Sequence, residues 1–283
     1  MIEPKIIFED SSLLVLDKPA GLAVHGFPGN TEPTLADWLL EKYPDIESVG
    51  EPESLRPTPY ALLPVSRCGL VHRLDRETSG VIVVAKTLEA YLSLKQQFSS
   101  GSAEEGYEGR PRKTYQALVY GLMKDDQGEI HRSIGRSRVN PKLRIVGAKA
   151  SGTSRDALTY YKVLERFNLL GKVESFEQEE RRKKKEGVSD FTFLECYPRT
   201  GRTHQVRVHL GSIGRPVVCD KLYAPGKPCL PGLTRHALHA ASIDIMLPTG
   251  ERKVFSAPLP IDMAGVLENL HKASFEQSTK HEI

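Results

Sequence analysis

One short stretch limits the folds open to this chain more than any other: a charged turn that runs directly into an apolar run. Residues 81–85 are mostly β-branched and show no polar alternation, which predicts a strand buried on both faces. Gly80 gives the backbone freedom at the join. Arg73, Asp75 and Arg76 lie within the turn. Charges so close to a buried strand either pair with one another or take part in chemistry, and this stretch alone leaves both readings open.

The rest of the chain alternates short strands with a few helices. Thr34 and Thr87 are suited to cap helices, because each precedes a run with apolar residues at helical spacing. Four residues form the expected buried stripe of the second helix: Leu88, Tyr91, Leu92 and Phe98. The expected helices cover 34–43, 87–98 and 203–213, and the expected strands 6–8, 13–16, 81–86, 113–121, 128–134, 142–148, 157–167, 191–197, 236–247 and 252–256. This pattern predicts an α+β fold with a mixed, largely antiparallel β-sheet and a few flanking helices.

Charge is distributed unevenly along the chain. Residues 1–60 carry four Lys or Arg and eleven Asp or Glu, whereas residues 131–149 carry six Lys or Arg and no acid. Residues 199–235 hold seven Lys or Arg and a single acid, Asp220. A surface of one sign is what the neutralisation of a phosphate backbone requires. A solvated basic surface without a ligand is the simpler alternative for either segment.

Several classes of protein and site find no support in the sequence. No apolar run is long enough to span a membrane, and the N-terminus has no signal-peptide pattern, so we expect a cytoplasmic protein with no membrane partner. The four cysteines form no Cys-x-x-Cys pair and are expected to be reduced thiols. The Walker loop and the signatures of serine hydrolases, zinc proteases and zinc deaminases are absent. His236 and His239 would face opposite sides of a strand, so we expect no metal site.

A second polar motif occupies residues 199–210. If a helix begins near Thr203, then Arg207 and Leu210 share a side with it, and Arg207 lies at the border of the apolar stripe. A guanidinium there could hold a buried carboxylate in its ionised form. Tyr115, on an expected strand, completes a set of three segments with residues suited to chemistry.

Together these motifs resemble those of the RluA-type RNA pseudouridine synthases. The central signature of that family is His-Arg-Leu-Asp, then Thr-Ser-Gly and an apolar strand ending in Ala-Lys, and it matches His72 to Lys86. The later signature, Thr-Gly-Arg-[Ser/Thr]-His-Gln-x-Arg-x-His, matches Thr200 to His209. Weaker blocks at 9–22, 113–115, 213–216, 238–240 and 257–260 extend the resemblance from about Ile6 to Ile261. Two long motifs in this order are too specific to match by chance.

The resemblance implies a pseudouridine synthase fold with a central RNA-binding cleft and an enzyme that isomerises uridines in ribosomal or transfer RNA. It implies Asp75 as the catalytic aspartate, Tyr115 as the side chain that packs on the target base, and Arg207 as the partner of Asp75. By the same resemblance, Arg73 fills the gap that a flipped nucleotide leaves. RNA contacts are expected from six residues: Arg73, His72, Arg76, Arg202, His204 and Arg215.

We also expect a monomer that works without a cofactor or a metal. The catalytic domain is expected over residues 1–270, followed by a polar tail at 271–283 that frays, and no S4 RNA-binding module is expected. Cys219 departs from the family pattern, which usually has Gly before this aspartate. The Pro-rich segment 44–68 and the charged run 177–186 also depart, and both bear on the choice of RNA.

One carboxylate suffices for such an isomerisation, because the reaction needs no redox step and no external energy. Asp75 can act as a nucleophile or as a base, and the sequence leaves both open. Two other classes remain. A noncatalytic RNA-binding protein would use Asp75 and Arg207 as a structural ion pair, and a nucleosidase-like hydrolase would need a second acid, for which Glu77 is the nearby candidate.

Overall fold

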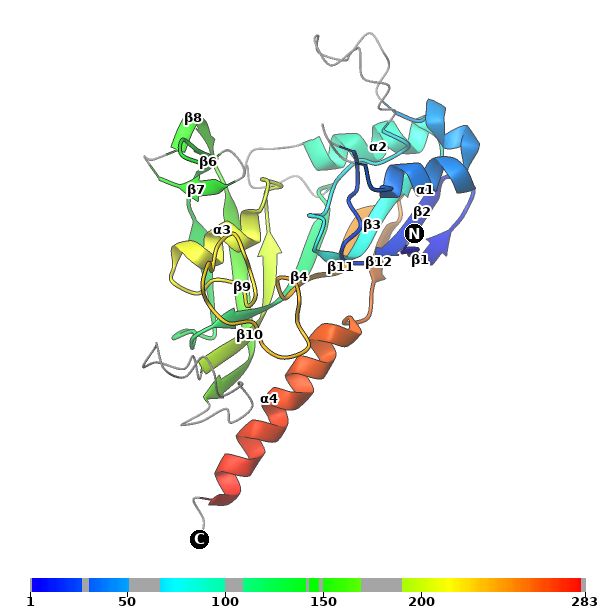
Figure 1. The fold of residues 1–283 in the computed structure, drawn as a ribbon. Helices are drawn as coiled ribbons and strands as arrows, with labels where there is room; N and C mark the ends of the chain where they lie inside the picture. The colour runs from blue at the N-terminus through cyan, green and yellow to red at the C-terminus, as the bar shows by residue number, and fades with distance from the viewer. Residues whose placement is uncertain are drawn as a thin grey trace. The chain divides into compact units, whose positions relative to one another are not determined.

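A computed structural model gives the fold of this chain (Figure 1). The residues that the structure describes are 2–26, 31–50, 67–99, 109–140, 143–147, 150–168 and 190–280. The chain divides into two compact units. Unit 1 consists of Met1–Thr114 and His239–Pro258, and unit 2 consists of Tyr115–Leu238 and Leu259–Ile283. Each unit is therefore assembled from segments that lie far apart in the sequence.

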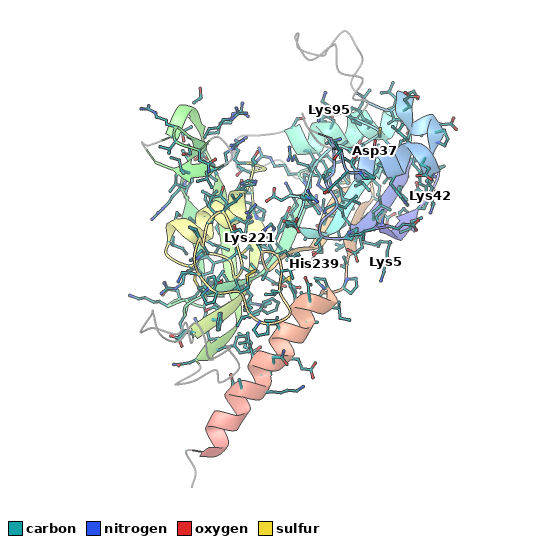
Figure 2. All side chains as sticks on the ribbon, viewed as in Figure 1. Lys5, Asp37, Lys42, Lys95, Lys221 and His239 are labelled. Carbon is teal, nitrogen blue, oxygen red and sulfur yellow. A yellow bond between two sulfur atoms is a disulfide. The ribbon has the colours of Figure 1, made fainter. Side chains whose placement is uncertain are left out.

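Five strands form the sheet of unit 1: β1 (Lys5–Glu9), β2 (Leu13–Lys18), β3 (Ser79–Ala85), β11 (Leu238–Met246) and β12 (Arg252–Ser256). β1–β2, β2–β3 and β11–β12 pair antiparallel, and β3–β11 pairs parallel. Every residue of β3 is buried, as the unbroken apolar run predicted. Gly80 has φ +113°, and a Cβ there would lie 2.1 Å from the carbonyl oxygen of Ala240, so only glycine fits. His239, labelled in Figure 2, bonds Ser79 through Nδ1 and Oγ at 3.0 Å.

The helices of unit 1 are α1 (Leu35–Lys42), the short 3₁₀ helix η1 (Pro44–Ser48) and α2 (Leu88–Ser99). Thr34 caps α1 as predicted, in a capping box whose second member is Asp37, labelled in Figure 2. Thr87 caps α2 as predicted, since its Oγ1 accepts from the Ala90 amide at 3.2 Å.

The stripe predicted for α2 is wrong in part. Leu88 and Leu92 are 46% and 48% exposed, whereas Tyr91 and Leu94 are buried. The face of α2 that points inward is therefore shifted from the predicted one, and it includes Gln97. Its Nε2 donates to the Met246 carbonyl at 2.8 Å and its Oε1 accepts from the Met246 amide at 3.1 Å. Two backbone bonds remove the penalty for burying the amide side chain.

Unit 2 contains two sheets. The larger has the order β4 (Arg112–Tyr120), β10 (Asp190–Pro198), β9 (Leu158–Asn168) and β5 (Gln127–His131), all antiparallel, with the unit boundary inside β4. The smaller has the order β7 (Arg144–Val146), β6 (Ile134–Ser137) and β8 (Ala150–Arg155), also antiparallel, and Figure 1 shows it in green. Ile134 packs with Val208 and Ala157, which joins this small sheet to the helix that contains Val208.

That helix is α3 (Gln205–Ser212), and α4 (Ile261–Lys280) is the second helix of unit 2. α3 begins two residues later than predicted, because His204 adopts φ +57°, in the left-handed region. Its first six residues are all buried, so it lacks the single apolar stripe that the sequence suggested. α4 was not predicted, and the expected tail boundary at residue 270 falls inside it.

The expectation of four reduced thiols is wrong for one pair. Cys219 and Cys229 form a disulfide, and Cys68 and Cys196 are free and buried. The Tyr120 hydroxyl brings the two ends of this loop together. It accepts from the Cys219 amide at 3.0 Å and donates to a carbonyl one residue before Cys229 at 2.6 Å. The spacing of the cysteines in the sequence does not predict this disulfide, because the loop is positioned by Tyr120, which lies far earlier in the chain.

The predicted fold class is confirmed: the sheet is mixed and mostly antiparallel, and four α-helices accompany it in the described residues. No helix of the described chain is long and apolar enough to cross a membrane. Residues 51–66 and 177–186, which hold most of the two departures from the family pattern, lie outside the described residues.

Candidate active site

Asp75 lies in the turn that leads into β3. The Thr78 amide donates to the Asp75 carbonyl at 3.0 Å and closes the turn, while Leu74 anchors it in the core of unit 1. Asp75 is half-buried and Arg73 is exposed. The turn therefore presents a carboxylate and a guanidinium on a backbone that continues into a fully buried strand.

The buried side chain of Lys18 holds this turn in place, a role that was not predicted from the sequence. Its side chain is 0% exposed, and Nζ donates to the carbonyls of Pro19 and Leu22 at 2.8 Å each and of Arg76 at 3.1 Å. The Gly21 amide donates to the same Arg76 carbonyl at 2.9 Å. An ammonium group has three donors, so these contacts explain how it can be buried. The available signal was a lysine placed between an apolar strand and a Pro-Ala-Gly turn.

Arg76 also serves the turn. Its Nε donates to the Gly21 carbonyl at 2.9 Å, Nη2 forms an ion pair with Glu32, and Nε lies 3.7 Å from Glu77. These carboxylates are largely exposed, so the ion pairs add little stability and mainly orient the side chain. The assignment of Arg76 to RNA binding stays a prediction.

His72 supports the strand next to the turn. Its Nε2 accepts from the Val83 amide at 2.9 Å, and its ring stacks on Phe98 with centroids 4.6 Å apart and planes 6° apart. Burial, with the charge of Lys113 nearby, lowers the pKa of His72 to about 3. Burial also lowers the pKa of Lys113 to about 8. His72 is therefore neutral at physiological pH, and its assignment to RNA binding stays a prediction.

In unit 2, Arg207 is buried and paired with Asp220. Nε and Nη2 contact the two carboxylate oxygens at 2.7 and 2.8 Å, a planar two-pronged contact, and the guanidinium lies 5.0 Å from the ring centre of Tyr223. The backbone amides of Leu222 and Tyr223 also donate to Asp220. Burial acts to raise the pKa of Asp220, but the hydrogen bonds and charge of Arg207 outweigh it and hold that pKa below its usual value.

Other polar residues of the second motif are used to hold α3 in place. Gln205 accepts from the Thr200 hydroxyl at 2.7 Å and donates to the Leu158 carbonyl at 2.9 Å. His209 bonds the Thr159 hydroxyl at 2.9 Å and the Arg132 carbonyl at 3.0 Å, and burial lowers its pKa. Sequence reasoning did not assign these supporting roles, since nothing local distinguishes a buried His or Gln from an RNA-facing one.

The remaining predicted residues of unit 2 lie at or near its surface. Tyr115 is half-buried on β4, opposite Cys196, and packs against the core. Arg202 donates from Nε to the Asp156 carbonyl at 2.9 Å, and Arg215 from Nε to the Leu122 carbonyl at 2.9 Å.

His204 bonds the Tyr223 hydroxyl through Nδ1 at 2.9 Å.

In unit 1, one turn holds four of the predicted residues: His72, Arg73, Asp75 and Arg76. The predicted partnership of Arg207 with Asp75 joins residues of the two units and stays a prediction. In the part of the chain that the structure describes, no three His, Cys, Asp or Glu side chains gather in a way that could hold a metal ion.

Comparison with known families decides what these motifs belong to. The RNA pseudouridylate synthase family matches residues 12–212, which include both signature motifs and all three predicted catalytic residues. The chain belongs to the RluA-type RNA pseudouridine synthase family. Members of this family are isomerases that act on RNA, so this RluA-type chain is an RNA pseudouridine synthase by class.

Relatives of this RluA-type synthase match over nearly its whole length. An uncharacterized RNA pseudouridine synthase of Bacillus subtilis, YlyB, is 35% identical over 94% of this chain and 73% of its own length. The ribosomal large subunit pseudouridine synthase D of Nitrosomonas europaea is 34% identical over 93% of this chain and 64% of its own length. The solved structure of human RNA pseudouridylate synthase domain containing 1 has a TM-score of 0.62, 22% identity and 95% coverage of both chains, which supports the fold.

Proposed function

We propose that this synthase isomerises specific uridines of large-subunit ribosomal RNA and that Asp75 carries out the chemistry. The setting of Asp75 supports this most: a carboxylate with solvent access in a turn that Lys18 and Arg76 tie to neighbouring backbone. A reacting group needs to be both reachable and fixed in orientation. The choice of RNA rests on relatives named ribosomal large subunit pseudouridine synthase D, at 34% and 35% identity.

The reaction needs few groups from the protein. The uracil N1–C1′ bond breaks, the base turns over, and C5 bonds to C1′. The proton on C5 is lost and N1 gains one, so product and substrate have the same composition. Asp75 acts either as a nucleophile at the ribose or the base, or as the base that removes a ribose proton. Both roles require the ionised carboxylate.

Three further residues complete the proposed set. Tyr115 stacks on the target base, which offsets part of the few kcal/mol that flipping a base requires. Arg73, exposed beside Asp75, occupies the space that the flipped base leaves. Arg207 favours the ionised form of Asp75. In unit 2 the same guanidinium contacts Asp220.

Tritium release from C5-labelled RNA tests this proposal. Transcripts that tile the large-subunit ribosomal RNA, and a set of transfer RNAs, are incubated with the full chain. We expect label release from one or a few ribosomal transcripts, with the base still attached to the RNA. Release from transfer RNA alone would contradict the ribosomal assignment. Free uracil would indicate a hydrolase, and RNA binding with neither product would indicate a noncatalytic binder.

A further inference from the structure

A pocket of about 460 Å³ opens in unit 2 beside the small sheet. Residues from β6, β7 and β8 and from the loop before α3 line it. Six of the lining residues are polar: Arg136, Arg144, Arg155, Arg202, Thr153 and Thr203. Three strands and the loop before α3, which are separate in the sequence, thus bring four guanidinium groups to one hollow.

No acidic side chain is among the residues that line this pocket. Asp156, next to Arg155 in the sequence, bonds His131 at 2.8 Å, and its carbonyl accepts from Arg202. Burial and the positive charge of Arg155 lower the pKa of Arg202, and Asp156 opposes this only in part. Positive charges that crowd together repel one another, and an anion that enters the hollow relieves the repulsion.

The size and chemistry of the pocket favour a phosphate group. A guanidinium contacts phosphate oxygens with two parallel N–H donors, and threonine hydroxyls add neutral donors. The volume is at the lower end of small-molecule sites and holds a phosphate with its sugar. Gly152, which also lines the pocket, leaves open space where a Cβ would stand.

The pocket is also firmly attached to the second signature motif. Gly201, Arg202 and Thr203 belong to both the motif and the lining. On the small-sheet side, Ile134 packs in one cluster with Val208 of α3, and Val146 packs against that cluster. A group bound in the pocket therefore has a defined place relative to α3 and Arg207 within unit 2.

We propose that this pocket binds a backbone phosphate of the RNA substrate, outside the nucleotide that is isomerised. The inference rests on the proposed function only in taking RNA as the partner. Arg136 and Arg144 belong to the basic segment 131–149 identified from the sequence, but neither they nor Arg155 were among the six residues predicted individually to contact RNA. The contact is to the sugar-phosphate backbone, so it adds affinity and orientation without reading sequence.

The test uses a fluorescent RNA hairpin built from A, C and G only, which contains no uridine and cannot be a substrate. Binding to the full chain is measured at several salt concentrations. The double variant Arg136→Gln/Arg155→Gln removes two charges from exposed side chains of the pocket. We expect the Kd to rise about tenfold. We also expect the slope of log K against log salt to fall by about 1.4–1.8, since each lost contact removes about 0.7–0.9.

The matched control is Arg138→Gln/Lys162→Gln. It removes two charges from exposed side chains of unit 2 that do not line the pocket. It should change the slope by less than half as much. Equal changes in both variants, or none in the pocket variant, would overturn the proposal. So would full competition by adenosine monophosphate at RNA-like concentrations, which would assign the pocket to a free nucleotide. Because the hairpin is not a substrate, these outcomes are independent of tritium release, so either proposal can fail alone.

Discussion

The turn at 72–78 and the segment at 199–209 carry similar charged residues, but their surroundings differ. In unit 1, Arg73 is exposed and Asp75 is half-buried, and much of the support comes from Lys18 and backbone carbonyls. In unit 2, Arg207 and His209 are buried and bonded to other protein groups. A charged motif can therefore expose its charged groups to solvent, or it can hold the scaffold together, and the sequence pattern looks the same in both.

This difference separates two kinds of mutational effect. Changes at the reactive position of the turn should affect turnover without affecting folding. Changes in the buried motif should affect folding, with a loss of turnover only where the altered contact also orients a catalytic group.

The largest effect is expected for Asp75→Asn. We expect single-turnover tritium release at saturating enzyme to fall by about 10²–10⁴-fold or more, since the charge is lost while the shape is kept. RNA affinity and the unfolding midpoint should stay close to those of the unchanged chain. Glu77→Gln is the matched control, an acid in the same turn, and should retain the rate within a few-fold. A rate for Asp75→Asn within tenfold of the unchanged enzyme would remove Asp75 from the catalytic role.

Next in size is Asp220→Asn, which leaves the buried Arg207 without its carboxylate. The free energy of unfolding should fall by about 3–5 kcal/mol in urea melts. Turnover per folded molecule should fall at least tenfold, because Arg207 loses its fixed orientation.

The control is Asp262→Asn. Asp262 makes an equivalent two-pronged contact with the buried Arg235, at 2.8 and 3.0 Å, outside the second motif. Asp262→Asn should lower the free energy of unfolding and leave single-turnover rates unchanged. If both variants reduce turnover per folded molecule equally, the Arg207–Asp220 pair has no special role in orienting the site.

The smallest effect concerns pH. The folded-state pKa of His72, about 3, lies below the ordinary value of about 6.5, so the unfolded chain takes up the proton first as pH falls. His72 therefore contributes stability above about pH 6.5 that is lost progressively as pH falls toward 3, with a slope of up to about 1.4 kcal/mol per pH unit. Urea melts between pH 7.5 and 4.5 should show this slope reduced in His72→Gln. His209→Gln should reduce it less, and the reverse order would contradict the larger lowering of the pKa of His72.

The sequence was most informative where the signal was local. The apolar run at 81–85 and the cap at Thr34 predicted β3 and α1 closely, since strand burial and helix capping depend on neighbouring residues. The inward face of α2 was not predictable in the same way. Gln97 turns inward because of two bonds to Met246, which lies far along the chain.

The partner of Arg207 shows a similar limit. Asp220 is the single acid among seven basic residues in 199–235, and this was the available signal. Using this signal would have required knowing that the chain reverses direction between Arg207 and Asp220. That reversal depends on positive φ angles at Gly214 and Cys219. A positive φ also explains why this synthase family favours glycine at the position of Cys219.

The small sheet of unit 2 was predicted only in part. β7 lies inside the strand predicted over 142–148, whereas β6, with four residues, is too short to establish a period and was not predicted as a separate strand. The pocket arginines therefore looked like a general basic segment. By contrast, the spacing of Met263, Val266, Leu267 and Leu270 gives the helical pattern of α4 and could have been used.

The split composition of unit 1 has a consequence for how the chain folds. β3 pairs in parallel with β11, which lies about 160 residues later, so this sheet is closed by one of the longest-range contacts in the chain. During synthesis, the strand at 79–85 leaves the ribosome well before its neighbour exists. The edge of β3 that pairs with β11 therefore cannot form this pairing until all of β4 to β10 has been synthesised. Completion of unit 1 is therefore a late event, and the turn that holds Asp75 gains its final support only when residues 239–258 have been synthesised.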